Sequence, residues 1–470
     1  MSIQEKMFKE IKDNKLFSLA NEFGFKYLSE AFDRNVYPIK TALINLADFD
    51  EPLLDCPIGA EDILVQLNRF GGPASVAQVG GRYFGFVNGN MVPAGLVTRL
   101  LSDYWNQNTA MKVMSPISAK LETVVQRWLI QLFGLPKECV AGFVSGTSMA
   151  TFCGLAAARY RILKNMSWDI NESGLFNAPH IRVVVGRQAH STVLKAISLL
   201  GFGKNNIEWV DTDNQGRILV DKLPVLDEKT IVILQAGNVN TGSFDYFSTI
   251  CEKANKSKSW IHIDGAFGLW AATVDKLRYL VDGIEKADSW SVDAHKTLNT
   301  PYDNGIILCK DSEALTASLH MTGSYIVVDE ERDGMFFTPE MSRRSRIIEL
   351  WATLKSLGKN GIDEMIYTMH ERAKQFKNEL ENADFLVLNE VVFNQVAVHY
   401  KSNEFTKELL KEVQDLSVCW CGGSKWQDKD IIRISVCSWA TTEEDVKKST
   451  KSFILARENV KKKLLTTSST

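Results

Sequence analysis

The sequence predicts an α/β protein: a mainly parallel β-sheet covered by helices, with a helical segment before it and a smaller α+β unit after it. Three observations support this fold class. From about residue 141, short β-branched runs alternate with helical stretches, which is typical of a parallel sheet covered on both faces. Before that point, apolar residues recur at helical spacing. Beyond residue 342, strands and helices follow in a looser order, as in an α+β unit.

The length and composition of the chain exclude several classes of protein. A chain of 470 residues suggests roughly three structural units. Its 45% hydrophobic and 24% charged residues exclude global disorder and a fibrous repeat. With 54 basic and 57 acidic residues, the net charge of −3 offers no field for a polyanion, so we do not expect nucleic acid as a partner.

Neither a membrane segment nor a metal site is predicted. No stretch approaches the ~20 apolar residues that span a bilayer, and residues 1–15 lack the apolar core of a signal peptide. We therefore expect a cytoplasmic protein. The eight cysteines form no CxxC pair, which favours free buried thiols. The seven histidines show neither HExxH nor HxxxH spacing, so no metal ligation is expected.

The expected elements follow in chain order. Residues 1–75 form a helical segment, a large α/β domain spans 76–341, and a smaller α+β domain spans 342–470 and ends in a frayed tail, KKKLLTTSST. The strands expected in the large domain are 142–145, 181–186, 207–210, 230–235, 260–264, 289–292 and 305–309. In the smaller domain we expect strands over 385–389, 395–400 and 431–437, and helices over 342–357, 363–381 and 404–414.

Residues that can carry chemistry follow several of these strands, and ligands of open α/β sheets bind beyond the carboxyl ends of the strands. The turn SGTSMA (145–150) leads into a helix, so its backbone N–H groups and the hydroxyls of Thr147 and Ser148 can cradle an anion. The same turn could be an ordinary helix cap. His190 follows the second strand, and a lone histidine is more often a structural residue.

Two further residues lie at strand ends: Asp264 ends the fifth predicted strand, and Lys296 lies just beyond the sixth. A carboxylate leaving a buried strand has to be paired or protonated, whereas a lysine there could simply reach water. Gly265 and Ala266 leave room for a flat group against the backbone. Together with His190 and the anion cradle, these residues are the set that pyridoxal phosphate (PLP) requires. Lys296 would form a Schiff base, Asp264 would keep the pyridine nitrogen protonated, and His190 would cover one ring face.

Several strings resemble those of the group II PLP-dependent decarboxylases, a family that includes glutamate, aromatic amino acid and diaminobutyrate decarboxylases. They are HIDGAFG (262–268), DSWSVDAHKTLNTPYDNG (288–305), QAHSTVLKAISLLG (188–201), RYFGFVNGNMVPAG (82–95), SPISAKLETVVQRWLIQLFGLP (115–136) and PEMSRRSRIIELWATLKSLG (339–358). The resemblance extends from about residue 37 to 450. It implies the aspartate-aminotransferase (type I) fold and the decarboxylation of an L-amino acid to an amine and CO₂ through a Schiff base at Lys296.

The resemblance also implies a role for each matched residue. Lys296, Asp264 and His190 match the Schiff-base lysine, the acid at the pyridine nitrogen and the imidazole stacked on the ring. The phosphate turn reads SGTSMAT here, where many relatives have SGGTEAN, so backbone donors and a hydroxyl remain. The other coenzyme-binding residues that the resemblance implies are Gly146, Thr147, Ser148, Asn238, Ala266, Asp293 and His295.

On the substrate side, Arg433 matches an arginine that binds a substrate carboxylate in some relatives, through a bidentate fork. It could instead lie at a domain interface or pair with a nearby acid such as Asp430. Phe84, Phe86 and Asn88 precede a turn that lines the substrate pocket in relatives, and they would suit either a flat aromatic or a small acidic side chain. By the same analogy we expect a homodimer with shared active sites, in which the N-terminal helices wrap the neighbour.

The sequence does not identify the residue that returns a proton to the product. In many relatives it is a tyrosine on a mobile loop, but the corresponding residues here, 327–342, contain Phe336 and Phe337 and no tyrosine. Tyr325, His190 or a water would have to substitute. An aminotransferase or an oxidative, aldehyde-forming enzyme therefore stays as the alternative, and we predict that Phe336→Tyr raises the measured ratio of amine to carbonyl product. A catalytically inactive homologue is a third alternative, against which the retained lysine argues.

Overall fold

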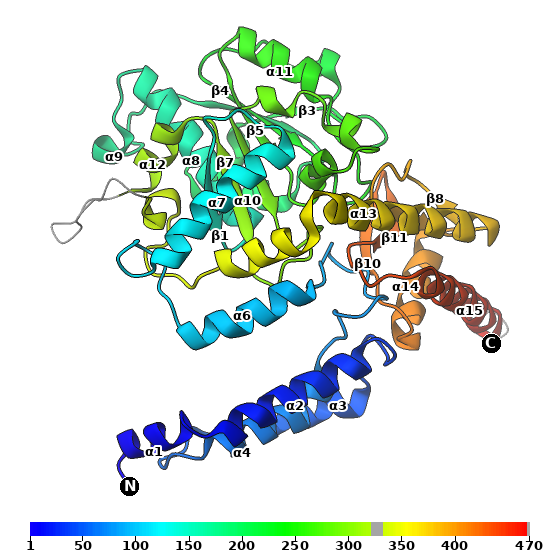
Figure 1. Cartoon of the computed structure of the whole chain (residues 1–470). Helices are drawn as coiled ribbons and strands as arrows, with labels where there is room; N and C mark the ends of the chain where they lie inside the picture. Colours follow the sequence, from blue (N-terminus) through cyan, green and yellow to red (C-terminus); the bar gives the residue numbers. More distant parts are fainter. Residues whose placement is uncertain (321–331, 468–470) are drawn as a thin grey trace.

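The fold is built around a seven-stranded sheet with helices on both faces (Figure 1). The structure is a computed structural model, and it describes residues 1–320 and 332–467. The strand order is β1-β7-β6-β5-β4-β2-β3. Pairs among β2 to β6 are parallel, whereas β7 runs antiparallel to both β1 and β6. The predicted α/β class with a mainly parallel sheet is therefore confirmed.

Each strand of this sheet coincides with a predicted run to within two residues. Every residue of β4, β5, β6 and β7 is buried, which is why these strands read as continuous apolar runs in the sequence. The seven strands are β1 Val140–Val144, β2 Arg182–Gly186, β3 Ile207–Val210, β4 Thr230–Gln235, β5 Trp260–Asp264, β6 Ser289–Asp293 and β7 Gly305–Cys309.

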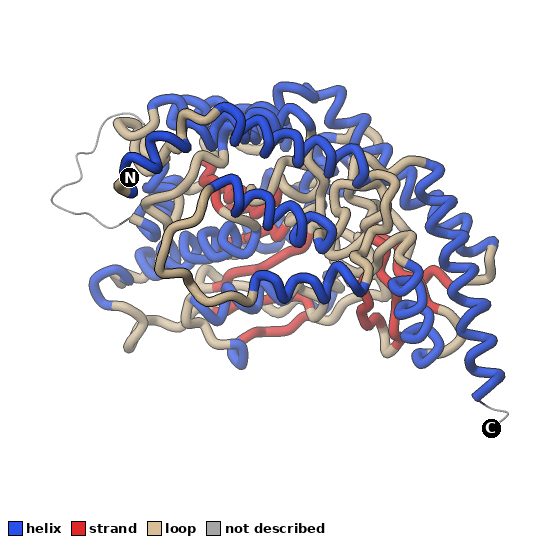
Figure 2. Tube along the Cα trace, turned by 90° about the horizontal axis from the view of Figure 1, so that it is seen from below, coloured by secondary structure: helices blue, strands red, loops and turns tan. Residues whose placement is uncertain are grey.

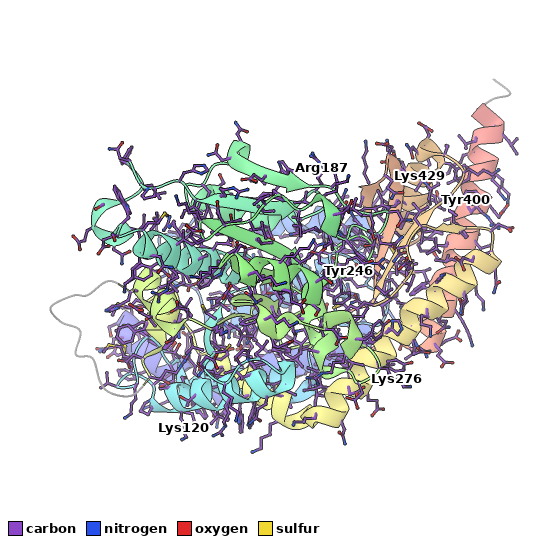
Figure 3. All side chains as sticks on the ribbon, turned by 90° about the horizontal axis from the view of Figure 1, so that it is seen from above. Lys120, Arg187, Tyr246, Lys276, Tyr400 and Lys429 are labelled. Atoms are coloured by element: carbon purple, nitrogen blue, oxygen red, sulfur yellow. The ribbon has the colours of Figure 1, made fainter. Side chains whose placement is uncertain are left out.

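Helices enclose the sheet (Figure 2), and side chains fill the space between the layers (Figure 3). The helix that follows β1 is rich in alanine and is buried along most of its length, so it packs closely on β5, β6 and β7. The helices of this part are α6 Pro93–Trp105, α7 Pro116–Phe133, α8 Thr147–Asn165, α9 Ile170–Ser173, α10 Ser191–Leu199, α11 Phe247–Lys256 and α12 Ser312–Leu319. Short 3₁₀ helices are η3 Lys204–Asn206, η4 Val220–Lys222, η5 Gly268–Thr273, η6 Arg278–Val281, η7 Ile284–Lys286 and η8 Gly334–Phe337.

A second, antiparallel sheet lies in the C-terminal part, with the order β10-β11-β9-β8. Its strands are β8 Leu386–Val387, β9 Gln395–His399, β10 Gly422–Trp426 and β11 Lys429–Ser435. The helices α14 Asn403–Leu416 and α15 Glu443–Thr467 pack beside it. Helical geometry in α13 Ile347–Asn382 is interrupted at Gly358, whose φ is 60°, so this range consists of two helical stretches, as the sequence predicted.

Several expectations for the C-terminal part differ from the structure. The helix expected over 342–357 begins only at residue 347, and the strand expected over 385–389 is limited to residues 386–387. The strand β10 was not predicted, because its sequence GGSKW carries two glycines and few β-formers. The frayed tail expected from residue 461 is wrong over 461–467, which continue α15. Buried Val446, Phe453, Ala456 and Val460 anchor that helix on the core, and residues 461–467 continue its helical pattern.

The N-terminal helices form an arm along one side of the molecule, next to α6 in Figure 1. They are α1 Ile3–Glu10, α2 Asn14–Ala31, α3 Lys40–Ile44, α4 Ala60–Gln66 and α5 Gly72–Ala74, with the helical turns η1 Asn45–Phe49 and η2 Leu67–Gly71. Only Ala31 and Ala42 of these helical residues are buried. Within the ranges that the structure describes, no helix of the chain has the length and apolar character needed to cross a membrane.

Candidate active site

The predicted chemical residues meet at one edge of the seven-stranded sheet. Asp264 and Asp293 are the last residues of the neighbouring strands β5 and β6, and the register pairs Asp264 with Ser291. His190 caps the N-terminus of α10, just beyond the end of β2. Because β2, β4, β5 and β6 are parallel, their carboxyl ends lie together. The sheet therefore brings the acid, the imidazole and the lysine loop to a common edge.

Lys296 pairs with Asp293 in this structure. Its Nζ lies 3.0 Å from Asp293 Oδ2, while Asp293 Oδ1 accepts a 2.6 Å hydrogen bond from the backbone N–H of Thr147 at the start of α8. Burial alone would raise the pKa of Asp293, but the charges of Lys296 and His295 hold it below its ordinary value. This carboxylate therefore ties the lysine to the N-terminus of α8.

Asp264 is a buried acid with 4% of its surface exposed. Its Oδ1 accepts a hydrogen bond of 3.2 Å from the backbone N–H of Ala266. Burial raises the pKa of Asp264 to about 6, although the nearby charge of Lys296 acts in the opposite direction. The site thus holds a carboxyl group that gains much from a cationic or N–H partner.

His190 is held in place by the first turn of α10. Its Nδ1 lies 2.8 Å from Thr192 Oγ1, and it accepts a 3.3 Å hydrogen bond from the Thr192 backbone N–H. Burial, together with the weaker effects of the Lys296 and Arg433 charges, lowers the pKa of His190 to about 4. The imidazole is therefore neutral at pH 7, and both cations lie close enough to act on it.

The first turn of α8 contains a buried hydroxyl without a hydrogen-bond partner among the described residues. This hydroxyl oxygen is Thr147 Oγ1. The side chain of Ser148 is exposed, and Gly146 precedes the helix in an extended conformation. A buried hydroxyl without a partner at a helix N-terminus is suited to an anion.

His295 and Tyr302 lie beside this turn. His295 Nδ1 accepts a 2.9 Å hydrogen bond from the backbone N–H of Asn304, and its Nε2 lies 3.6 Å from Asp293 Oδ2. Burial lowers the pKa of His295. The ring of Tyr302 lies over that of His295, with 4.3 Å between centroids. Sequence reasoning missed Tyr302, although an aromatic residue six positions after the lysine was the available signal.

Asn238 is engaged in its own turn. Its Oδ1 accepts hydrogen bonds from the backbone N–H groups of Asn240 at 2.9 Å and Thr241 at 3.2 Å. Its Nδ2 donates to the carbonyl of Gln188, two residues before His190. Ala266 accepts a hydrogen bond from the Asp293 backbone, which joins the ends of β5 and β6. Asn238 therefore fixes the loop beside the imidazole.

The segment of residues 85–89 packs against the lysine loop. A Cβ atom at Gly89 would collide with the carbonyl oxygens of His295 and Lys296, so this close approach requires glycine. Phe86 is 61% exposed, whereas Phe84 is buried in the C-terminal core. Asn88 Nδ2 donates to Gln78 Oε1 at 3.3 Å. The backbone of this turn at Gly89 thus lies against the backbone carbonyl of Lys296, whereas the Phe86 ring is exposed.

Arg433 lies on β11, opposite Gly422 of β10. Its neighbours Ile432 and Ile434 face the C-terminal core, so Arg433 points to the other side of the sheet. Its Nε is buried without a partner among the described residues, and burial lowers the pKa of the guanidinium. Asp430 pairs instead with Lys407 at 3.4 Å, so the expected alternative of an Arg433–Asp430 ion pair is wrong.

The residues expected to affect proton return lie in or beside the part that the structure does not describe. Tyr325 is outside the described residues. Phe336 packs edge-on against His320 with 4.4 Å between ring centroids, and Phe337 lies under the guanidinium of Arg332. Both phenylalanines belong to η8, next to β1.

Comparison with known protein families shows which family the chain belongs to. A family model described as the pyridoxal-dependent decarboxylase conserved domain matches residues 82–401. The chain belongs to this family. It is a PLP-dependent carboxy-lyase that acts on an amino acid, and the alternative of an aminotransferase or an oxidative, aldehyde-forming enzyme is not favoured.

Relatives of this pyridoxal-dependent decarboxylase act on more than one class of amino acid. The aromatic-L-amino-acid decarboxylase of Bacillus atrophaeus is 28% identical over 401 residues, 80% of this chain and 81% of that protein. The acidic amino acid decarboxylase GADL1 of Mus musculus is 26% identical over 68% of this chain and 60% of its own length. The structure of Oryza sativa TDC with PLP and tryptamine superposes with a TM-score of 0.87 at 20% identity, covering 95% and 97% of the two chains. That likeness confirms the type I fold.

Three features of the decarboxylase site fit PLP. The unpartnered hydroxyl of Thr147 suits a phosphate oxygen. The buried carboxyl of Asp264 suits a protonated ring nitrogen, because burial raises its pKa and a nearby positive charge would offset that cost. The side chain of Lys296, 21% exposed at the strand ends, suits covalent attachment. The residues present therefore agree with the coenzyme that the family uses.

Proposed function

We propose that this chain decarboxylates an L-amino acid to the corresponding amine and CO₂, with Lys296 as the residue that binds PLP covalently. The observation that carries the proposal is the convergence of Lys296, Asp264 and His190 at one sheet edge, beside an anion cradle. When bound, PLP supplies an electron-withdrawing ring that accepts the electron pair left by the departing carboxylate.

Each residue then has a role that follows from its charge and position. Asp264 would face the ring nitrogen and hold a proton there, and a protonated neighbour would return its raised pKa toward the usual range. His190, neutral at pH 7, would cover the ring without adding a competing positive charge. Ala266 would lie on the opposite ring face, where its small side chain avoids a collision.

The phosphate would be held by the turn before α8. The residues proposed to bind it are Gly146, Thr147, Ser148 and His295. Asp293 already accepts from the Thr147 backbone, so its role is to position Lys296 and the start of α8. Asn238 would help to position His190, because its Nδ2 donates a hydrogen bond to the carbonyl of Gln188, two residues before the histidine.

Arg433 is proposed to bind a carboxylate of the substrate. Its guanidinium lies close enough to His190 to affect the imidazole, and its Nε has no partner within the described part of the chain. An unpaired buried donor costs free energy until an acceptor reaches it, and a carboxylate accepts through the guanidinium fork. Phe86 and Asn88 are proposed to lie near the substrate side chain.

We also propose a cytoplasmic homodimer with shared active sites. The dimer is supported by the N-terminal arm, which leaves large apolar side chains exposed, among them Ile11, Phe25, Ile39 and Ile44. The cytoplasm is supported by eight free cysteines, of which seven are buried. We propose the division into residues 1–75, 76–341 and 342–470 as the three domains.

Borohydride trapping tests the proposal. The yellow enzyme is reduced and digested, and we expect the coenzyme on the peptide that contains Lys296. Lys296→Ala should remove both the label and CO₂ release from a panel of amino acids, while Lys195→Ala, on the outer part of α10, serves as the matched control and should keep both. Attachment to another lysine, or a colourless protein that takes up no PLP, would refute the assignment.

A further inference from the structure

Asn299, three residues beyond Lys296, lies where separate parts of the chain meet. Its side chain is completely buried, with 0% of the residue exposed. The side-chain oxygen Oδ1 accepts hydrogen bonds from the backbone N–H groups of Asn90 at 3.2 Å and of Trp439 at 2.9 Å. Asn90 precedes α6, whereas Trp439 follows β11 in the C-terminal part. One oxygen atom therefore joins two segments that lie far apart in the sequence.

The nitrogen of the same amide holds the lysine loop. Asn299 Nδ2 donates to the backbone carbonyls of Lys296 at 2.9 Å, Thr297 at 3.0 Å and Cys437 at 2.9 Å. The backbone N–H of Asn299 donates to the same Lys296 carbonyl at 2.9 Å. If the oxygen and the nitrogen of the amide were exchanged, donors would face donors and carbonyls would face an oxygen. The partners therefore fix the orientation of the amide.

The backbone at this position also suits asparagine. Asn299 has a φ of 58°, in the left-handed region that Asn and Asp occupy more readily than other residues with a side chain. Its carbonyl accepts a hydrogen bond of 2.8 Å from the backbone N–H of Val92. Gly89 lies against the Lys296 carbonyl in the same turn, where a Cβ atom would collide with it. Both the side chain and the main chain of Asn299 thus hold the lysine loop against residues 89–92.

These contacts relate the lysine to the strand that carries Arg433. Cys437 and Trp439 follow directly after β11, which contains Arg433, while Lys296 lies just beyond β6 of the large sheet. The amide of Asn299 bonds to both segments, so it sets how the lysine main chain lies relative to the end of β11. Small displacements matter here, because a shift of about 1 Å between reacting groups can slow a reaction about a hundredfold.

We propose that Asn299 is a positioning residue for decarboxylation: its buried amide fixes the main chain of Lys296 relative to Arg433. The inference rests on the proposed function, because it assumes that PLP is bound to Lys296 and the substrate carboxylate to Arg433. Asn299 acts through the Lys296 carbonyl and through the segment after β11. Asparagine is the shortest side chain that carries both a carbonyl acceptor and an NH₂ donor, and this position uses both.

The test uses two variants of Asn299 and one control. Asn299→Gly removes the whole amide and keeps a backbone that tolerates a positive φ. Asn299→Asp keeps an oxygen toward the N–H groups of Asn90 and Trp439 but loses the donor toward the lysine loop. The control Ser438→Ala removes the partner of Asn90 Nδ2 at 2.8 Å, a contact between the same two segments that does not involve the lysine loop.

Three measurements are made below the unfolding temperature of each protein. Hydrogen exchange of the coenzyme-free chain, resolved to single residues by mass spectrometry, reports on the N–H groups of Asn90 and Trp439. A pH titration of the yellow colour of the PLP-loaded protein reports on the surroundings of the Lys296 amine. Values of kcat and KM are measured for the amino acid that the wild-type enzyme decarboxylates fastest among a panel of amino acids.

We expect Asn299→Gly to speed exchange at both N–H groups, to shift the midpoint of the colour titration and to lower kcat about tenfold to a hundredfold. Asn299→Asp should shift the midpoint and lower kcat in the same way, but exchange at Asn90 and Trp439 should stay slower than in Asn299→Gly. Ser438→Ala should keep the wild-type kcat and midpoint.

Four results would overturn the inference and leave the proposed function intact. They are wild-type kcat and midpoint in Asn299→Gly, an equal loss of kcat in Ser438→Ala, and unprotected N–H groups of Asn90 and Trp439 in the wild type, which needs no variant. The fourth is loss of cooperative unfolding in both Asn299 variants, which would make the residue a requirement of the fold. Attachment of PLP to a lysine other than Lys296 in the wild type would instead overturn the proposed function.

Discussion

Asp264 illustrates a conflict between stability and function at a single residue. Its carboxyl is buried, and its pKa lies at about 6 in the fold against an ordinary value of 3.8. Since the folded state binds the proton more tightly than the unfolded state, the ionised carboxylate destabilises the coenzyme-free protein above pH 6. The penalty disappears as the pH falls toward 4. Under the proposed function, the same carboxylate would stabilise a protonated ring nitrogen once the coenzyme is bound.

We therefore predict opposite effects of Asp264→Asn on the two forms of the protein. At pH 8 the coenzyme-free variant should be more stable than the wild type by up to about 3 kcal/mol, and the difference should vanish near pH 4. The loaded variant should lose most of its activity and bind PLP more weakly. Urea unfolding at both pH values and a PLP titration measure these effects. A variant less stable at pH 8 than the wild type would contradict the burial argument.

Arg433 gives a second prediction for a single residue. If its fork binds a substrate carboxylate, Arg433→Lys keeps the charge but loses the bidentate geometry. We expect KM to rise roughly tenfold to a hundredfold, since a hydrogen bond to a charged group contributes about 1.5–3 kcal/mol. The PLP absorbance should not change. Lys407→Ala, which removes the partner of Asp430 on the same sheet, is the control and should leave KM unaltered.

The sequence located the residues of the site better than it located their contacts. Asp264, His190 and Lys296 could be found because each follows a β-rich run, and parallel strands bring such positions to one edge. The pairing of Lys296 with Asp293 depends on rotamers and could not be read from spacing. Trp420 lies more than 300 residues from Phe86, and only the folded chain brings the two rings together.

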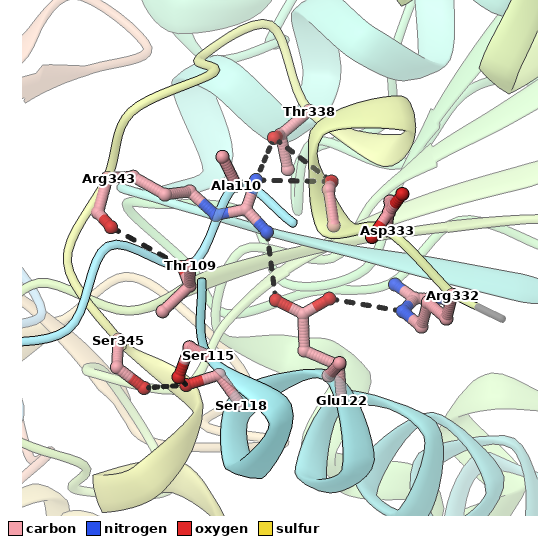
Figure 4. A network of polar contacts seen from close by, with 12 residues as sticks. Thr109, Ala110, Ser115, Ser118, Glu122, Arg332, Asp333, Thr338, Arg343 and Ser345 are labelled. Atoms are coloured by element: carbon pink, nitrogen blue, oxygen red, sulfur yellow. Dashed lines mark hydrogen bonds and ion pairs between the residues drawn. The ribbon is translucent and has the colours of Figure 1, made fainter. Parts of the chain in front are cut away.

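At the scale of elements, the link between α7 and the residues around η8 depends on one buried acid (Figure 4). Glu122 of α7 is 3% exposed and binds Arg332 Nε at 3.1 Å and Arg343 Nη2 at 2.8 Å. Arg343 also donates to the carbonyl of Gly334 and to Thr338, and Arg332 donates to Gln126 at 2.7 Å. Two buried guanidinium groups thus share one carboxylate.

We predict that Glu122→Gln lowers the free energy of unfolding by about 3–5 kcal/mol, because it leaves two buried cations without a negative partner. Thermal and urea unfolding of the full chain provide the measurement. The matched control is Glu313→Gln on α12, which also loses contacts with two cations, Arg161 and Lys164, but is exposed. Exposed pairs contribute little, so the control should unfold like the wild type. Equal effects of the two changes would contradict this view of the network.

The helices and strands differ in how well they can be predicted from the sequence. The strands of the large sheet were predicted because full burial demands uninterrupted apolar runs. β10 has no such run, and its partner β11 supplies the pairing that makes GGSKW extended. Similarly, the last residues of α15 are helical because buried positions earlier in that helix fix its course. Where tertiary contacts decide, local propensity is a poor guide.

At the scale of the whole molecule, the N-terminal arm accounts for much of the exposed apolar surface. Phe25 is 72% exposed, Ile39 61% and Ile44 70%, although all three belong to or adjoin ordered helices. Isolated apolar residues on a surface need no explanation, but a sustained series along one arm indicates a covered face. In the proposed dimer, a second copy of the chain would cover this apolar face.

We predict that the double variant Phe25→Glu/Ile44→Glu converts the dimer into monomers and lowers decarboxylase activity, because two charges would have to be buried unpaired at the contact. Light scattering after size-exclusion chromatography should give twice the mass of one chain for the wild type and a single chain for the variant. Circular dichroism should remain the same, since both side chains are exposed within the protomer. Phe176→Glu, at an exposed position outside the arm, should stay dimeric and active. A variant that keeps the dimeric mass would show that the arm is not the contact, and a monomer with full activity would show that each active site is complete within one chain.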